Sequence, residues 1–410
     1  MTDGQPERAT VNRIADVDSR INEFCTVFSD LREDFRSKAL IHTTLVLGRM
    51  ELVQLQMASA IDLMRVYLQS FNRLTLSYDF QGCQQVLRPE EMDGFKRTPC
   101  LQNTRRNIIN DIVQWIADDS NKAKKVLWVY GLAGTGKSTL STTIAQIMLS
   151  IHRLGAFFFF NRDIPQRNSG TLIRTLAYQL AMFDARFGAA ISRLVTDNGN
   201  IAIMPLEFQF ENLLLNTLTS VEWSGGPIVL IIDALDECGR EADRRDLMQA
   251  LSKGFSNLPS FIRIMVVSRQ ESDIQHALGS HSHVRQCHLD TNSVINKEDI
   301  SEYVRHRLER IRIRNGRLGD HWPGEDKISS LANRADGLFL WASTACLYIE
   351  SYTPDRRLSQ LVHKQQGGHS SGPFAHLDSL YETGLQSADL WHDAFFRSDC
   401  CNILGTILCA

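Results

Sequence analysis

The sequence lacks the marks of a secreted or membrane-spanning protein. Its nine cysteines are scattered and form no CxxC pair, which argues against a zinc ribbon or a disulfide framework and favours a reducing compartment. No run approaches the ~18 apolar residues that a membrane helix needs. The polar N-terminus has no apolar core of a signal peptide. We therefore expect a cytoplasmic protein without a transmembrane segment.

Strong charge of one sign and internal repeats are also missing. The formal net charge is −3, so no basic excess points to nucleic acid, and we expect no nucleic-acid partner. The arginine-rich stretch from Arg305 to Arg317 includes Glu309 and follows closely after Glu302. These acids offset part of its charge and favour a solvated helix face over a nucleic-acid site. His281, His283 and His288 lie close in sequence. They have no cysteine or carboxylate at ligand spacing, which favours a solvated loop over a metal site.

The composition is that of a globular protein, and 410 residues suggest roughly two or three domains. Residues 1–95 are predicted to be a helical N-terminal region, because Ile41–Phe71 is densely apolar with close to helical spacing. A packed bundle is favoured over an oligomerisation or signalling module. Gln81–Pro99 has two prolines and mixed charges, and its pattern is typical of a linker.

Residues 96–292 carry a different pattern. Thr104–Asp118 is predicted to be an amphipathic helix, and short, nearly continuous apolar strands then alternate with helical segments. Such strands are typical of a parallel sheet that is covered on both faces. We expect an α/β domain with a five-stranded parallel sheet, with strands at Val126–Tyr130, Ala156–Phe160, Ile228–Ile232, Ile262–Val267 and Val284–Leu289.

Residues 293–410 are predicted to be helical again. Helices are expected at Asp299–Ile313, Glu325–Ala335 and Leu338–Glu350, and Gln365–Pro373 is predicted to be a flexible loop. We interpret this region as a helical lid that follows the sheet.

A phosphate-binding loop lies between the first strand and the next helix, and it matches G-x-x-x-x-G-K-[ST] in full. Its glycines allow backbone angles that turn consecutive N–H groups into one pocket, and the following helix adds the positive end of its dipole. The lysine reaches the β- and γ-phosphates, and the serine hydroxyl binds magnesium. The predicted nucleotide-binding residues are Gly131, Leu132, Ala133, Gly134, Thr135, Gly136, Lys137, Ser138 and Thr139.

A second acidic motif ends the strand Ile228–Ile232. Asp233 follows the apolar run as in a Walker B motif, where a buried strand delivers one carboxylate to the magnesium shell. Asp233 and Ser138 are therefore the predicted metal ligands. Glu237 is the candidate base that orients and deprotonates the attacking water, and Asp236 is expected to support the metal shell. The alternative for Glu237 is a solvated loop residue.

Polar residues also end two neighbouring strands. Arg269 follows Ile262–Val267 and is predicted to read the γ-phosphate as a bidentate donor. A surface arginine is the alternative. Asn161 and Arg162 follow the phenylalanine-rich strand at the same edge of the sheet, with a weaker case for a role.

These motifs together resemble the NACHT domain of signal-transducing STAND NTPases. The resemblance is carried by VLWVYGLAGTGKSTLSTTIA, GAFFFFNRD, IVLIIDALDECG and IRIMVVSRQ. The family has a small residue directly after the magnesium aspartate and acids just downstream, and Ala234, Asp236 and Glu237 stand at those places. PCLQNTRRNIINDIVQWIAD resembles the lead-in of fungal NACHT proteins, and LANRADGLFLWASTACLYIE and LDSLYETGL resemble their later helices.

The resemblance covers about three quarters of the chain, from Cys100 to Ala410. It implies an ATP- or GTP-dependent switch with Mg²⁺, in which hydrolysis is slow, and a strand order of 5-1-4-3-2 with the site at the carboxyl ends of the strands. Fungal members of this family act like innate immune receptors. A nucleotide-dependent scaffold without hydrolysis is the alternative; a motor-like ATPase or a small-molecule kinase is less favoured.

The chain ends at ILGTILCA, about where a winged-helix segment of this family would begin, and no repeats follow. The resemblance therefore implies a receptor of NOD-like type without its sensor repeats. We expect either a truncated product or decoy, or a short form that works as a homo-oligomer or with a separate sensor protein.

Overall fold

The computed structural model describes residues 81–92, 97–118, 120, 124–279, 281–351, 353–363, 378, 380, 381 and 383. The chain divides into two compact units, Met1–Asn72 and Arg73–Ala410. Every described residue belongs to the second unit. The predictions for the helices before residue 81, for the loop Gln365–Pro373 and for the chain after residue 383 lie outside the described residues. Within the described part, no helix combines the length and apolarity that crossing a membrane requires.

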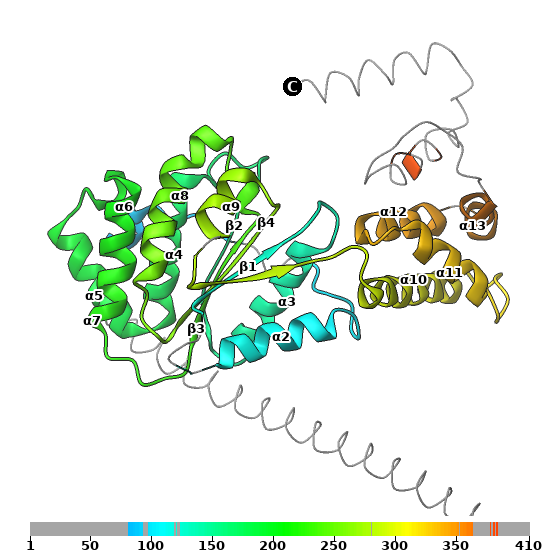
Figure 1. The fold of residues 1–410 in the computed structure, drawn as a ribbon, viewed down its shortest axis with the longest axis horizontal. Coiled ribbons are helices and arrows are strands. Elements are labelled where there is room, and N and C mark those ends of the chain that lie inside the picture. The colour runs from blue at the N-terminus through cyan, green and yellow to red at the C-terminus, as the bar shows by residue number, and fades with distance from the viewer. Residues whose placement is uncertain are drawn as a thin grey trace, which may run out of the picture. The chain divides into compact units, whose positions relative to one another are not determined.

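Five parallel strands form the centre of the fold (Figure 1). Their order is β2-β3-β4-β1-β5, which is the expected order 5-1-4-3-2 counted from the opposite edge. β3 and β4 are buried along their whole length, as their continuous apolar sequences predicted. The strands are β1 (Val126–Tyr130), β2 (Leu154–Phe159), β3 (Ile228–Asp233), β4 (Ile262–Ser268) and β5 (Val284–His288).

Helices cover both faces of the sheet, so alternate residues of each strand enter different cores. Val126 and Trp128 of β1 belong to one cluster, while Leu127 and Val129 belong to the other. Figure 1 shows α2 (Arg106–Ala117) and α3 (Lys137–Ser150) on the opposite side of the sheet from α4 and α8. The second side carries α4 (Ser169–Phe183), α5 (Ala185–Asp197), α6 (Leu206–Gln209), the π-helix η3 (Phe210–Asn216), α7 (Thr217–Ser220), α8 (Glu241–Ser256) and α9 (Ser272–Leu278).

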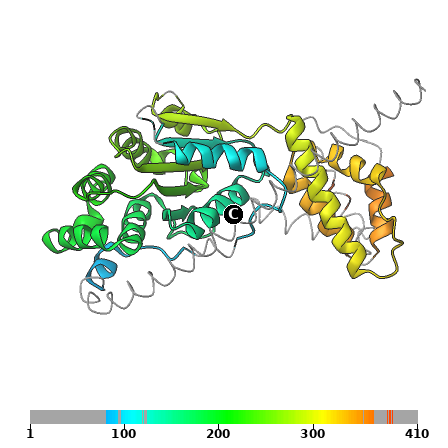
Figure 2. The same cartoon turned by 90° about the horizontal axis from the view of Figure 1, so that it is seen from below.

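The helices after the sheet build a core of their own, drawn in yellow and orange in Figure 2. Ion pairs join its helices: Arg307 and Arg314 both reach Glu350, and Arg305 reaches Glu325. These pairs engage part of the arginine-rich stretch within the lid itself. The helices are α10 (Val294–Arg314), α11 (Glu325–Arg334), α12 (Phe339–Glu350) and α13 (Pro354–His363).

The largest differences from the sequence prediction concern three segments. Residues 81–87 are helical, so the linker interpretation is wrong there; the buried side chains of Cys83 and Leu87 join the core beside the sheet. α10 begins five residues before the expected Asp299, because the Ser293 hydroxyl accepts a hydrogen bond from the Asn296 N–H and caps the earlier start. α13 was not expected.

Candidate functional site

The glycine-rich loop joins β1 to α3, as predicted from the motif. Gly134 and Gly136 have φ of +79° and +84°, in the left-handed region that a side chain would strain. Gly136 is the N-cap of α3 and provides no side-chain acceptor for the first turn of the helix. Those first N–H groups therefore remain available to an anionic ligand at the positive end of the helix dipole.

Lys137 lies across the mouth of this loop. Its Nζ donates to the carbonyl oxygens of Gly131 at 2.9 Å and Leu132 at 2.8 Å. Burial is the main cause that lowers the pKa of Lys137, and the nearby Asp236 acts in the opposite direction. The ammonium is thus held inside the loop by two carbonyl acceptors, which a phosphate oxygen would replace with a charged partner.

Asp233 and Ser138, the two predicted metal ligands, lie together. Asp233 ends β3 with a fully buried side chain, and its Oδ1 lies 3.3 Å from the Ser138 Oγ, which donates to it. A hydroxyl and a carboxylate are the oxygen donors that Mg²⁺ prefers. The residues present therefore fit a magnesium ion that is shared with a nucleotide phosphate.

The other carboxylate oxygen of Asp233 has a partner that the sequence did not predict. Arg97 Nη1 donates to Oδ2 at 2.8 Å, and the Arg97 guanidinium also lies 4.7 Å from the centroid of the Phe159 ring. Arg97 belongs to the segment interpreted as a linker. The two residues of the pair are 136 positions apart, so no local pattern marked it.

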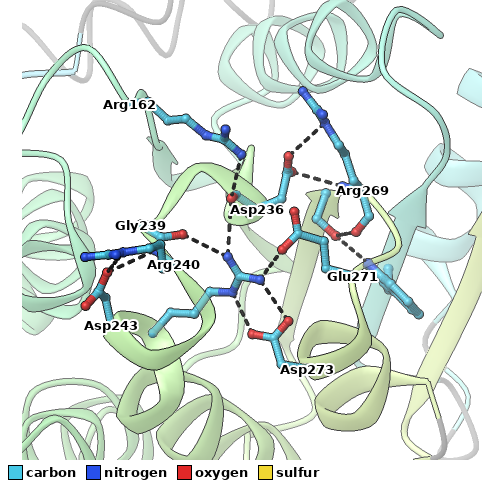
Figure 3. A network of polar contacts seen from close by, with 11 residues as sticks. Arg162, Asp236, Gly239, Arg240, Asp243, Arg269, Glu271 and Asp273 are labelled. Carbon is cyan, nitrogen blue, oxygen red and sulfur yellow. Dashed lines mark hydrogen bonds and ion pairs between the residues drawn. The ribbon is translucent and has the colours of Figure 1, made fainter. Parts of the chain in front are cut away.

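Asp236 contacts the residue that follows β4, and its charge also acts on Lys137. Its side chain is buried, its Oδ1 accepts the backbone N–H of Arg269 at 2.9 Å, and its Oδ2 pairs with Arg269 Nε at 3.2 Å. Figure 3 shows the Arg269 side chain folded onto this carboxylate. Asp236 thus holds Arg269 in place, and its predicted support of the metal shell stays a prediction.

Glu237 follows in the same short 3₁₀ turn, Leu235–Glu237, after Ala234. Burial raises the pKa of the half-buried Glu237 carboxyl, and the negative charge of Asp236 raises it further. A carboxylate with a raised pKa is a better proton acceptor near neutral pH. The chemistry of Glu237 is therefore suited to the predicted role of a base, and its role stays a prediction.

Asn161 and Arg162 end β2 with different contacts. The Asn161 side chain accepts the N–H of Asp163 at 2.9 Å and so serves its own turn. Arg162 Nη2 reaches the carbonyl oxygen of Asp236 at 3.5 Å, and Figure 3 shows it pointing into the network around that residue. Of these two weaker candidates, only Arg162 is brought to the acidic turn.

Arg244 of α8 is a buried residue of this network that sequence reasoning missed. It forms a two-pronged ion pair with Asp273, at 2.6 and 2.8 Å, and a further pair with Glu271. These hydrogen bonds raise the pKa of Arg244, because they stabilise its charged form. Next to it lies a cavity of about 470 Å³ whose lining is polar: Arg162, Gly239, Arg240, Glu241, Asp243, Arg244, Glu271, Ser272 and Asp273 (Figure 3).

The lid contacts the phosphate loop directly. The backbone N–H of Leu340, in the first turn of α12, donates to the Gly134 carbonyl at 3.0 Å. Arg105, before α2, donates from Nη2 to the Thr135 carbonyl at 2.7 Å and lies over the Phe339 ring, 4.7 Å from its centroid. The loop is thus held from outside by two elements, one on each side of it in the sequence.

Comparison with known proteins finds two similarities. A family model described as Nephrocystin 3, N-terminal, matches residues 103–269. A solved structure of C. elegans PCH-2 is similar at 13% identity and a TM-score of 0.37, covering 68% of this chain and 69% of that chain. None of the curated proteins compared matches. The strand order and the glycine-rich loop show a P-loop NTPase-like α/β fold, and the family match covers the segment from α2 to Arg269 that builds the site.

Proposed function

We propose that this protein is a nucleoside-triphosphate-binding switch of the NACHT type, with slow Mg²⁺-dependent hydrolysis and ATP as the preferred nucleotide. The observation that carries the proposal is the meeting of Ser138 and Asp233 beside a loop whose glycines have positive φ. A strand-end carboxylate, a helix-start hydroxyl and a helix N-terminus without a side-chain cap form the binding set for a phosphate and its metal.

Each residue has a defined task in this proposal. Lys137 leaves the two loop carbonyls and binds the terminal phosphates, while Ser138 and Asp233 hold the magnesium ion, which would neutralise phosphate charge. Glu237, with its raised pKa, positions and deprotonates water. Arg269 turns from Asp236 toward the γ-phosphate. Hydrolysis then resets the switch.

The contacts between the loop and the lid support a switch over a metabolic enzyme. The Gly134 carbonyl accepts a hydrogen bond from α12, and the Thr135 carbonyl accepts one from Arg105. A phosphate that changes the shape of the loop therefore changes both contacts. A ligand shifts a conformational equilibrium only through such differential contacts. We propose that the loaded state assembles, with further copies of this chain or with a separate sensor protein, in the cytoplasm.

One observation favours the second candidate, a nucleotide-dependent scaffold without hydrolysis. The Arg269 guanidinium is already paired with the buried Asp236, so turning toward a phosphate would leave that carboxylate without its partner. In a scaffold without hydrolysis, the ion pair between Arg269 and Asp236 stays intact when the nucleotide binds. Glu237→Gln separates the two candidates: the switch loses phosphate release, and the scaffold has the same background rate before and after the change.

The central experiment measures binding of labelled ATP and GTP, with Mg²⁺, to the purified chain and to Lys137→Ala. Losing a charge-assisted contact to phosphate should weaken binding at least about tenfold. Lys253→Ala is the matched control, because Lys253 of α8 forms a solvent-exposed ion pair with Glu207 of α6, outside the phosphate loop. Size exclusion of the same samples tests assembly. If neither nucleotide binds to the wild type, the proposed function is wrong.

A further inference from the structure

Arg97 stands at the place on Asp233 that the proposed metal would need. Asp233 has a fully buried side chain and Arg97 one that is 30% exposed, so the guanidinium reaches inward to the end of β3. Its Nη1 lies 2.8 Å from Oδ2, and the Phe159 ring covers one side of the cation. This is an ion pair in a partly desolvated place, which is stronger than a pair on an open surface.

Each carboxylate oxygen of Asp233 has its own partner. Oδ1 takes the Ser138 hydroxyl and Oδ2 takes Arg97. A buried carboxylate without a cation is strongly unfavourable, so the metal-free protein needs a positive partner at this position. Mg²⁺ held by Ser138 and Asp233 would supply that charge and would repel a guanidinium a few ångströms away.

We propose that Arg97 is an internal stand-in for the metal, which competes with Mg²⁺ for Asp233 and must withdraw when Mg²⁺·nucleotide binds. This inference rests on the proposed function. Arg97 lies outside the sheet and before α2, so its withdrawal moves a residue that is not part of the phosphate loop.

A second arginine keeps the neighbouring chain in place when Arg97 leaves. Arg167 lies over the same ring, 4.1 Å from its centroid, and its Nη2 donates to the Glu91 carbonyl at 3.1 Å. Residues 81–92 therefore keep an attachment that does not depend on Asp233. The movement that we infer is confined to Arg97 and to the backbone next to it.

The test is a Mg²⁺ titration of fluorescent ATP binding to the wild type, Arg97→Ala and Arg97→Gln. The matched control is Arg285→Ala, which removes a guanidinium–carboxylate pair of 2.7 Å with Asp111, a partly exposed pair outside the phosphate loop. Without Mg²⁺, all four proteins should bind ATP within about twofold of each other. With Mg²⁺, the half-saturating metal concentration should fall about tenfold in both Arg97 variants and remain unchanged in the control.

Thermal unfolding gives a second readout that does not need turnover. Without metal, Arg97→Ala should have a lower Tm than the wild type, because Asp233 loses its cation, and Mg²⁺·ATP should raise the Tm of the variant more than that of the wild type. Arg97→Gln keeps a donor and serves if the alanine variant folds poorly.

The outcomes are distinct. An unchanged or higher metal requirement in both Arg97 variants overturns the competition while leaving the proposed function intact. Weaker ATP binding in these variants without Mg²⁺ also overturns it, since Arg97 would then be a phosphate ligand. A wild type that binds no nucleotide under any condition removes the proposed function, and the competition with it.

Discussion

Arg105→Ala tests whether the phosphate loop is held in shape by its neighbours. Arg105 is 4% exposed, donates to the Thr135 carbonyl at 2.7 Å and lies over the Phe339 ring of α12. Its backbone N–H donates to Asp299 of α10 at 3.0 Å. The side chain thus connects the start of α2 to both the loop and the lid.

The magnitude follows from these contacts. A hydrogen bond from a charged donor contributes about 1.5–3 kcal/mol, and a partly desolvated cation–π contact contributes about 1 kcal/mol. Burial of the guanidinium opposes them, and it is the main cause that lowers the pKa of Arg105. The substitution leaves the backbone bond to Asp299 in place. We expect the net free energy of unfolding to fall by about 2–3 kcal/mol.

Arg106→Ala is the matched control, because the neighbouring arginine is exposed and its side-chain contact is with Asn103. Urea unfolding followed by circular dichroism compares the two variants with the wild type. With an m-value of about 3 kcal/mol/M, the midpoint of Arg105→Ala should fall by about 0.7–1 M, and that of Arg106→Ala should stay within about 0.2 M. Equal midpoints for the two variants would refute the view that Arg105 supports the loop.

Three further substitutions test the turn, the acid and the core. Ala234→Gly should raise the free energy of unfolding by about 0.5 kcal/mol in a thermal melt, because Ala234 has φ of +55°, and a lower value would contradict a strained turn. Glu237→Gln should stabilise the protein at pH 7 by less than about 1 kcal/mol, because solvent screens the half-exposed carboxyl. The pKa of Glu237 is raised in the folded state, so this residue favours folding fully only at pH values below its pKa in the unfolded chain. The advantage is lost as the pH rises through the folded-state pKa. The gain from Glu237→Gln should therefore vanish near pH 4, which thermal melts from pH 4 to 8 check. Gly254→Ala should cost about 1–3 kcal/mol in urea unfolding, because a Cβ would lie 2.2 Å from the Phe210 ring, whereas Gly316→Ala has open space and should change little.

Local patterns predicted the sheet and the loop because their signals are contained in short segments. A continuous apolar run such as Ile228–Ile232 specifies a buried strand wherever it lies, and the glycines of the loop have only one common use at that spacing. The covering of both faces followed from the same runs, whereas the order of the strands came from the family resemblance alone. The meeting of Ser138 and Asp233 followed in turn, because carboxyl ends of parallel strands share one edge.

Contacts that depend on tertiary packing were not predictable in the same way. Arg97 meets Asp233 across 136 positions, and the residues around it have prolines and mixed charges that are typical of a linker. The contact of Asp236 with Arg269 was also not predicted. Ala234 has a positive φ just after β3, and Asp236 then accepts the backbone N–H of Arg269 across 33 positions.

The charges of the site are largely matched by its own residues, and this explains why its two buried aspartates are stable there. Asp233 has Arg97, Asp236 has Arg269, and Lys137 is held by carbonyl oxygens. Glu237 is half-buried: burial and the charge of Asp236 raise its pKa, while Arg162 acts in the opposite direction. If a nucleotide and its metal bind as proposed, they exchange partners within this set: phosphates take Lys137, and the metal takes Asp233. Arg97 is then the cation left without its carboxylate, so binding must move it, and a switch needs such a forced movement.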